Sequence, residues 1–238
     1  TFTVAYTSDT YPDGITAQCA VHTTYQSQGG GGGGGSSSGG TTETIKNPDG
    51  STTTTVTKPD GSTVETTKNP DGSQQVVEKD KDGTVTTTTT DKTGNKTETV
   101  EKTDGTSQTT VTNKDGSGSV TSVAESGQVE TEVKLPAAVV GGAAEKEEAV
   151  ALPMPNVPVT SDRENAPTVT VDLPSGTSAK VEIPVKGVTA GTVAVLVKAD
   201  GTQEVLKDSL ATEKGITVTL SDGDTVKIVD NAKTFADV

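Results

Sequence analysis

The amino-acid sequence predicts an all-β protein, and three observations indicate this fold class. A glycine recurs every eleven residues through the middle of the chain, and aspartate precedes most of these glycines. The runs between them are rich in Thr and Val, which favour strands. The C-terminal part carries further short apolar runs between Gly turns, a pattern typical of a small β-sandwich. The turn glycines of the repeat are Gly50, Gly61, Gly72, Gly83, Gly94, Gly105, Gly116 and Gly127.

Composition limits the size of any core and the classes of partner. Only 29% of the 238 residues are apolar, against about 45–50% in typical domains, and there is no Trp. The net charge of −14 disfavours nucleic acid as a partner. No apolar run approaches the roughly 18 residues of a membrane span, so no membrane insertion is expected. The chain opens at Thr1 with neither Met nor a signal peptide, so we expect a piece of a longer protein.

The N-terminal region predicts a hairpin followed by a linker. In residues 1–28, alternating runs at 2–6 and 17–25 flank a turn at 11–14. A lone hairpin is marginal in water, so we interpret it as the C-terminal hairpin of a truncated β-domain. Residues 29–40 contain only Gly and Ser and form a flexible linker.

Residues 41–117 are interpreted as a stalk of Thr-rich hairpins, each repeat being a strand and a turn. If residues 59–61 form a three-residue loop, Lys58 pairs with Ser62 and Val56 lies opposite Val64. If the later Asp-Gly turns are two-residue loops, Val100 and Val111 share a face. The two loop types give opposite face rules, so the strand register stays open.

A disordered stalk is the alternative interpretation of the repeat. Thr supplies 26 of the 87 residues between 41 and 127, none is aromatic, and few are apolar. Such a segment buries little apolar surface to offset the cost of ordering its backbone. We prefer the hairpin sheet, although both interpretations give an elongated polar stalk.

Residues 118–232 hold enough apolar residues for a core and predict a β-rich domain of sandwich type. We expect a strand pair around Gly127, a short helix within 136–146 and a brief strand at 149–152. Three hairpins are expected next, with turns at 174–176, 200–201 and 222–223. They would pair 169–173 with 179–183, 193–197 with 205–206, and 216–220 with 226–228.

No motif predicts a metal site. The run from Asp80 to Thr84 resembles the start of an EF-hand loop, but its glycine comes at loop position four instead of six. Val85 occupies position six, and no Glu follows at position twelve. We therefore interpret Asp80 as a turn residue, and Asp222 and Asp224 in the same way.

No catalytic or cofactor site is predicted either. Cys19 and His22 have half of a zinc-ligand spacing, but two ligands make no structural site and would face opposite sides of a strand. They cannot form a catalytic relay, and Cys19 is expected to be a small buried side chain. A single cysteine allows no internal disulfide, and pairing with a residue outside this sequence stays open. The glycosylation sequon that begins at Asn95 is expected by chance in a Thr-rich run.

The end of the chain resembles the junction into a surface-layer homology (SLH) module. The run 227–238 ends in Phe235-Ala236-Asp237-Val238, and such modules commonly open with Phe-x-Asp-Val. The runs 181–185, 191–195 and 199–202, and the Asn-Pro-Asp-Gly-Ser-Thr repeat, are similar to regions upstream of SLH modules in Gram-positive surface proteins. The resemblance covers residues 41–238, with 233–238 as the start of a module that is itself absent.

The resemblance implies a secreted, modular protein located at the cell wall or S-layer. Cell-wall polymer would then be bound only by the absent SLH modules, and a glycan or protein ligand by absent N-terminal modules. We expect the linker and the repeats to act as a non-enzymatic spacer that holds outward modules away from the wall anchor, with residues 118–232 as the wall-proximal domain and no cofactor. A binding module that recognises glycan or protein through the Thr-rich sheet or its edges is the alternative. An enzyme fragment whose catalytic part lies upstream is the third hypothesis.

Overall fold

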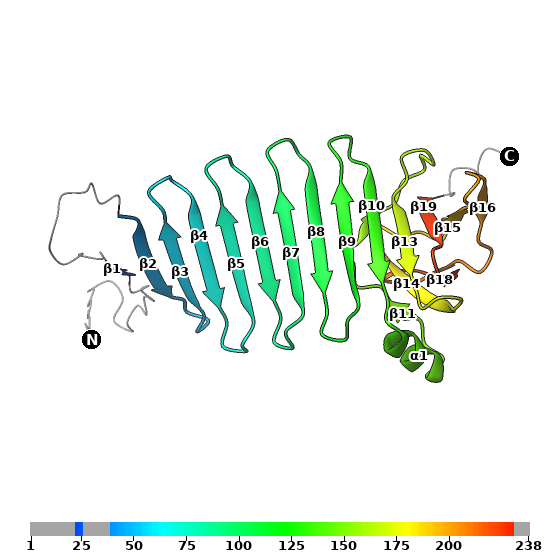
Figure 1. Cartoon of the computed structure of the whole chain (residues 1–238), viewed down its shortest axis with the longest axis horizontal. Helices are drawn as coiled ribbons and strands as arrows, with labels where there is room; N and C mark the ends of the chain where they lie inside the picture. The colour runs from blue at the N-terminus through cyan, green and yellow to red at the C-terminus, as the bar shows by residue number, and fades with distance from the viewer. Residues whose placement is uncertain (1–21, 26–38, 231–238) are drawn as a thin grey trace, which may run out of the picture.

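A 14-stranded sheet runs through almost all of the protein, as Figure 1 shows. The computed structural model describes residues 22–25 and 39–230. Strands β2 to β10 are consecutive and antiparallel, each pairing with the next along the chain. The protein is therefore all-β, as predicted. The strands of this meander are β1 (His22–Tyr25), β2 (Thr41–Lys46), β3 (Thr52–Thr57), β4 (Thr63–Lys68), β5 (Gln74–Lys79), β6 (Val85–Thr90), β7 (Lys96–Glu101), β8 (Ser107–Thr112), β9 (Gly118–Val123) and β10 (Val129–Lys134).

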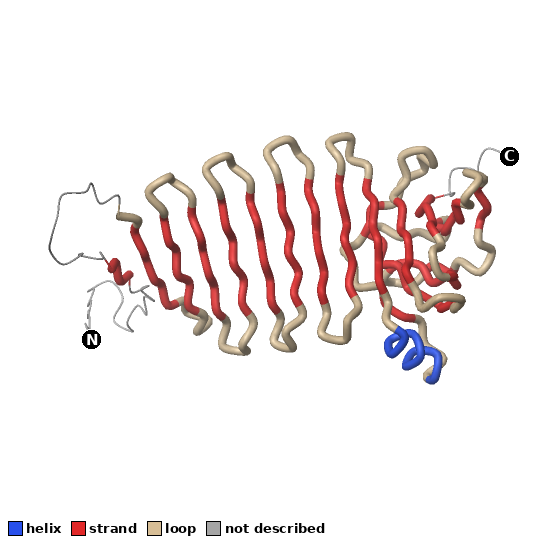
Figure 2. Tube along the Cα trace, in the orientation of Figure 1, coloured by secondary structure: helices blue, strands red, loops and turns tan. Residues whose placement is uncertain are grey.

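The C-terminal part adds a short helix and a second, smaller sheet (Figure 2). The long sheet continues from β10 in the order β13, β19, β15, β16, while β11, β14, β18 and β17 form the small sheet and β12 pairs with β14. The elements are α1 (Ala137–Glu145), β11 (Val150–Ala151), β12 (Val157–Pro158), β13 (Thr168–Asp172), β14 (Ser178–Lys186), β15 (Thr192–Val197), β16 (Gln203–Val205), β17 (Leu210–Ala211), β18 (Gly215–Ser221) and β19 (Thr225–Asp230).

A crossover joins the meander to the two-layered part. β10 and β13 are parallel neighbours, so the chain between them must return to the starting end of the sheet. It does so through α1, β11 and β12, and the latter two belong to the small sheet. The sheet thus passes the predicted domain boundary at residue 118 without interruption, because β9 and β10 belong to the meander.

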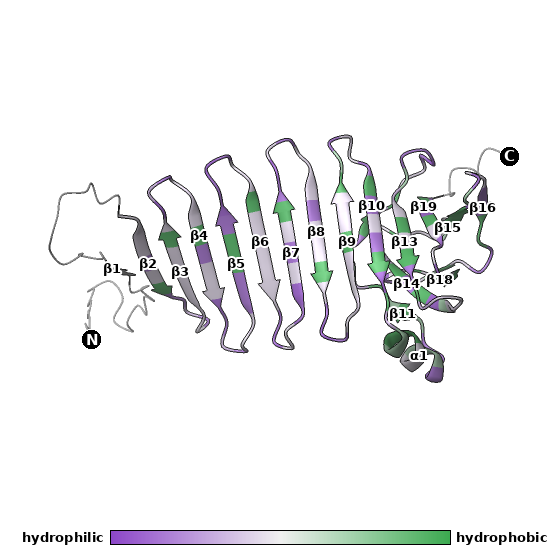
Figure 3. Ribbon diagram, viewed as in Figure 1, coloured by the Kyte–Doolittle hydropathy of each residue, from purple (hydrophilic) through white to green (hydrophobic). Residues whose placement is uncertain are grey.

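In the described residues, the hydrophobic core lies between the two sheets, at the C-terminal end only. Its buried apolar side chains start at Val129, and none lies in β2–β9. Figure 3 shows the same contrast, since hydrophobic bands are sparse along the meander. We call the face of the long sheet that carries Val133, Val169 and Val171 the inner face, and the opposite one the outer face. Residues 39–230 are therefore two layers deep at one end and a single layer along the rest of the long sheet.

All eight turns of the repeat have the same three-residue loop. Lys58 N–H donates to the Ser62 carbonyl at 2.8 Å, Gly61 N–H donates to the Lys58 carbonyl at 3.0 Å, and the other seven turns repeat this pair. The predicted pairing of Val56 with Val64 is confirmed. The two-residue alternative is wrong, because Val100 lies opposite Gln108 and Val111 opposite Thr97, on different faces. The left-handed glycine is the third residue of the loop. Because the loop has three residues instead of two, the strand positions that share a face shift by one.

Three hairpins were expected after residue 168, and two of these predictions are wrong. β15 and β16 pair across 200–201 as predicted. β13 and β14, however, belong to different sheets, and so do β18 and β19. Their turns are arches that carry the chain from one sheet to the other, so the apolar faces of consecutive strands face each other across the core. Each of these strands has one apolar face. Two such strands bury more apolar surface when they lie in facing layers than when they are neighbours in one sheet.

The N-terminal expectations fall mostly outside the described residues. Residues 1–21 and 26–38, with Cys19 and the linker, and residues 231–238, with the Phe235–Val238 motif, lie there. Within the expected second strand of the hairpin, β1 is described, and it pairs antiparallel with β2. The predicted short helix is confirmed as α1.

Candidate functional surface

Seven of the eight turns of the repeat are hydrogen-bonded units built around an aspartate, and the turn at 124–128 contains none. In the first, the Asp49 carboxylate accepts from both the backbone N–H and the hydroxyl of Ser51, at 2.9 and 2.7 Å. Gly50 follows with φ +85°, a conformation that disfavours any residue with a Cβ. The eight glycines all lie between +84° and +90°. The Asp-Gly-Ser or Asp-Gly-Thr run therefore fixes the turn locally, without help from a core.

Such hydrogen bonds lower the pKa values of six turn aspartates. The Ser51 hydroxyl, followed by its N–H, stabilises the charged form of Asp49 and lowers the pKa of that carboxyl. Asp60, Asp71, Asp104 and Asp115 have lowered pKa values for the same reason. At Asp91 the Thr93 hydroxyl and further donors lower the pKa to about 2. These carboxylates accept hydrogen bonds as turn residues, and none has the raised pKa of a general acid.

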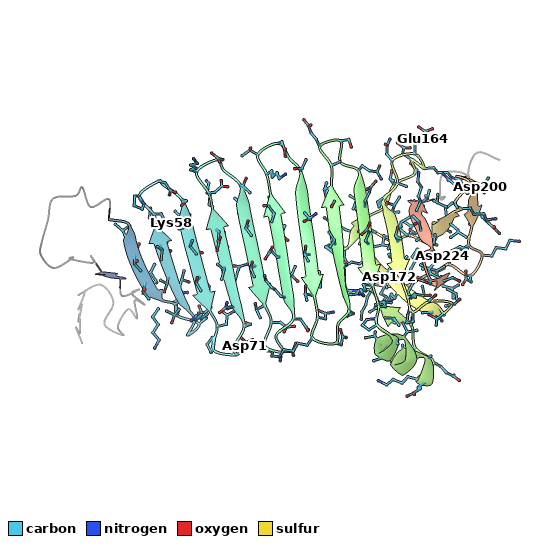
Figure 4. All side chains as sticks on the ribbon, in the orientation of Figure 1. Lys58, Asp71, Glu164, Asp172, Asp200 and Asp224 are labelled. Carbon is cyan, nitrogen blue, oxygen red and sulfur yellow. The ribbon has the colours of Figure 1, made fainter. Side chains whose placement is uncertain are left out.

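Turns on the same end of the sheet touch each other. Successive turns lie at opposite ends of the strands, as Lys58 and Asp71 illustrate in Figure 4. A Cβ on Gly50 would lie 3.2 Å from Cγ of Pro70 in the next turn on that end. Farther along, Lys114 N–H donates to Oδ1 of Asn95 at 3.1 Å. On the opposite end, a Cβ on Gly83 would lie 2.8 Å from Cγ2 of Thr103 in the next turn, so each end of the meander is a row of neighbouring turns.

Most of the candidate residues named in the sequence analysis make hydrogen bonds within turns and loops. Oδ1 of Asp80 accepts from the N–H groups of Asp82 and Thr84. Asp222 accepts from Leu173 N–H at 3.2 Å, and Asp224 from Ser221 N–H at 2.7 Å. The Asn95 amide donates to both Asp91 and Thr93. His22 lies in β1, and Cys19 lies outside the described residues.

The described residues contain neither a metal-binding cluster nor a membrane-spanning helix. Among them, no group of three or more His, Cys, Asp or Glu side chains is placed to hold a metal ion. No helix in that part of the chain is long and apolar enough to cross a bilayer. The meander itself presents two extended faces.

The inner face of the meander is rich in threonine and continuous with the core face. Residues paired across strands share a face, so the registers assign every side chain. Lys79 and Glu101 are terminal residues of their strands, at the rim of this face. From β6 to β9 the inner face carries Val85, Thr87, Thr89, Thr97, Thr99, Glu101, Ser107, Thr109, Val111, Ser119, Thr121 and Val123.

Threonine hydroxyls on this face bond to each other across strands. The pairs are Thr53 with Thr67 at 2.9 Å, Thr99 with Thr109 at 3.1 Å, and Thr121 with Thr131 at 3.0 Å. The last pair is buried, with both residues at most 5% exposed, while Thr99 and Thr109 are half-buried. The same side-chain arrangement thus occurs in the covered and the uncovered part of one face.

A groove marks the step where the second layer begins. Residues 152–155 cross the inner face over β8 and β9, and the Ser119 hydroxyl donates to the Pro153 carbonyl at 2.5 Å. The groove has a volume of about 540 Å³, a floor of Thr97, Thr99, Thr109 and Val111, and a wall that includes Met154. It lacks aromatic and charged side chains, so it offers shape and hydroxyl groups to an occupant and no ionic anchor.

The sequence did not predict which side chains share the inner face, because this depends on the number of residues in each loop. One signal was available in the sequence: Asn opens the turns at 47, 69 and 113, which lie 22 or 44 residues apart. The amides of Asn47, Asn69 and Asn113 donate to the serine hydroxyl of their own turns. A repeat of 22 residues, two strands long, returns each position to the same end and the same face. No protein-family model and no curated protein matches the chain.

Proposed function

We propose that this chain is a non-catalytic spacer of a secreted surface protein attached to a bacterial cell wall, holding outward modules away from their anchor. The observation that carries the proposal is the single-layer meander, in which nine consecutive strands extend away from the only two-layered part of the described chain. Each repeat adds one strand spacing of about 4.8 Å along the sheet. Its geometry therefore converts repeat number into length.

Local turn chemistry supports this role. The turns are stabilised by their own Asp, Ser and Asn groups, so a strand can be added without enlarging a core. The surface location rests on the resemblance of 41–238 to regions upstream of SLH modules, and that part of the proposal belongs to the sequence alone.

Small-angle X-ray scattering tests the shape that the proposal needs. A compact chain of this length has a radius of gyration of about 18 Å, which corresponds to a sphere about 46 Å across. Fourteen strands side by side span about 65 Å. We expect an asymmetric distance distribution with a maximum dimension above 65 Å in dilute solution. A symmetric distribution ending near 46 Å would contradict the spacer.

A further inference from the structure

We propose that the Asp82–Gly83 bond is a site of spontaneous isoaspartate formation, because among the described Asp–Gly pairs of the repeat it is the one whose carboxyl the fold leaves unheld. The inference concerns the covalent chain and does not depend on the spacer role. Asp–Gly is especially prone to this rearrangement, since glycine has no side chain to hinder attack on the aspartate carboxyl. The described repeat contains six such pairs, so the other five serve as controls for Asp82–Gly83.

The reaction needs no reagent except water. The backbone nitrogen of Gly83 attacks Cγ of Asp82, the new N–Cγ bond closes a succinimide ring, and the C–OH bond of the carboxyl breaks. One water leaves, made of that hydroxyl and the proton of the glycine N–H. Water then adds to either ring carbonyl, which restores aspartate or gives isoaspartate, with the backbone passing through Cγ. The carboxyl must therefore be protonated and free to rotate.

Hydrogen bonds hold the carboxyl in five of the six pairs. Oδ1 of Asp104 accepts from the N–H and the hydroxyl of Thr106, at 2.9 and 2.7 Å. These bonds fix the orientation of the carboxyl and favour its charged form, so the pKa of Asp104 is lowered. The serine two residues on makes the same two bonds to Asp49, Asp60, Asp71 and Asp115.

Asp82 is the exception, because a second aspartate takes the donor that it would use. Oδ1 of Asp80, the first residue of this turn, accepts from the N–H groups of Asp82 and Thr84, both at 2.9 Å. The other five turns begin with Lys or Asn, so the corresponding N–H is left for the third residue. Within the described residues, the exposed carboxylate of Asp82 therefore accepts no hydrogen bond and forms no ion pair.

The attacking nitrogen is restrained to a similar degree in these turns, so the carboxyl decides the difference. Gly83 N–H donates to the Asp80 carbonyl at 3.2 Å, and the equivalent bond of Gly105 is 3.1 Å long. A hollow of about 280 Å³ beside Asp82, next to the turn at 58–62, gives its carboxyl room to rotate. Cyclisation at Gly83 requires release of that N–H, whereas Asp104 must also lose two hydrogen bonds.

Incubation of the folded full chain in heavy-oxygen water tests the site, since each cyclisation and hydrolysis leaves one heavy oxygen in the peptide. At about pH 5 a small fraction of ordinary aspartate is protonated. Digestion after glutamate then gives peptide 79–98, whose one Asp–Gly pair is Asp82–Gly83, and peptide 66–78, whose one pair is Asp71–Gly72. Peptide 79–98 should gain heavy oxygen at least about tenfold faster, the effect of a single hydrogen bond to a charged group. Fragmentation by electron transfer should place the isoaspartate at position 82.

The same incubation in urea separates the effect of structure from that of sequence. In the unfolded chain all six pairs combine Asp with Gly without a held carboxyl, so their rates should be similar. A peptide 79–98 that stays tenfold faster in urea would overturn the proposal. Equal rates in the two peptides of the folded chain would overturn it as well.

A reciprocal exchange of the first turn residue tests the cause. Asp80→Lys frees the Thr84 N–H for Asp82, which should then react as slowly as Asp104. Lys102→Asp should divert the Thr106 N–H in the same way and accelerate the reaction at Asp104 by about tenfold. Rates that change in neither variant would contradict the role of the first turn residue and, with it, the proposal.

Lys58→Asn is the matched control for these exchanges. Asn opens three other turns of the repeat whose aspartates stay bound to serine, so the rate at Asp60 should not change. Circular dichroism identifies any variant that fails to fold, and the comparison of the two peptides in the unmodified chain does not depend on the variants.

Discussion

At the scale of single residues, the turns carry the specificity of the meander. Each loop has one left-handed glycine, and in seven of the eight loops an aspartate carboxylate accepts hydrogen bonds from the turn. Strand residues are far less constrained, since many are threonines on half-exposed faces. Substitutions in turns should therefore have larger effects than substitutions between them.

Replacing a turn glycine should destabilise the protein through backbone strain alone. Gly61 has φ +86° and open space around the position of a Cβ. Gly61→Ala should lower the free energy of unfolding by about 1–2 kcal/mol, the cost of a left-handed conformation. Gly141→Ala is the control, because this glycine lies exposed within α1, and alanine there should stabilise by about 0.5–1 kcal/mol. Chemical denaturation measures both, and a neutral Gly61→Ala would contradict the strain argument.

The turn aspartates should make stability depend on pH in the acidic range. Six of them have pKa values that are lowered in the folded state, so their contribution to stability is present above the unfolded value of about 3.9. It is lost as the pH falls through the folded value, which is about 2 for Asp91. The thermal midpoint should therefore drop between about pH 4 and pH 2.

Asp91→Asn isolates one of these groups. The variant should be less stable at neutral pH and should show a shallower decline of the thermal midpoint below about pH 4. Identical slopes for both proteins would show that Asp91 does not contribute.

At the scale of elements, the sequence period and the structural period differ by a factor of two. Eleven residues make one strand and one turn, but neighbouring strands run in opposite directions and begin on opposite faces. Twenty-two residues restore both direction and face. Lys46 and Lys68, which share an outer-face row, illustrate this longer period.

Deletions of one and two repeats should behave differently. Removing residues 63–84 joins Ser62 to Val85 and leaves each face of β2 and β3 on the same side as before, relative to the strands that follow. Removing residues 63–73 turns β2 and β3 over relative to those strands. With spin labels at positions 54 and 110, in a Cys19→Ser background, the separation should fall from about 24 to about 14 Å after the longer deletion. The shorter deletion should give about 19 Å and place the labels on opposite faces. An unchanged separation would contradict the strand-by-strand geometry.

The sequence was sufficient for strands and turns but not for the partners of every strand. Asp-Gly spacing and Thr-Val runs located β2–β10, because these elements depend on neighbouring residues. The arches after β13 and β18 could not be recognised in the same way, since Gly176 and Gly223 suit a hairpin and an arch equally well. Which one forms depends on burying Val171, Val181 and Val218 between two layers, a non-local gain. The inner face escaped prediction because one extra loop residue decides which side chains share it.

At the scale of the whole molecule, stability is concentrated at the C-terminal end. The core joins residues from β10 to β19, and the meander grows from the edge of that core. Strands far from it have half-buried side chains and neighbours within one layer only. Local opening should therefore become easier from β10 toward β2.

Core and meander substitutions should reveal this gradient. Ile228→Ala, at a fully buried position, should lower the free energy of unfolding by about 2–5 kcal/mol. Ile45→Ala, at a half-buried position in β2, should cost less than about 1 kcal/mol. Hydrogen exchange should show that Ile45→Ala increases opening only in the first strands. Equal global effects would indicate a uniformly cooperative sheet.

The single-layer meander also determines how the chain would respond to mechanical tension. Its two ends lie at opposite ends of the sheet, so a pull along the long axis loads the strand-to-strand hydrogen bonds one pair at a time (Figure 1). Each released repeat exchanges about 4.8 Å of folded width for up to about 38 Å of extended chain. Eight repeats hold a reserve of about 260 Å, released strand by strand at low force while the two-layered end stays folded. Under such a load the meander would lengthen in small steps and refold strand by strand when the load falls.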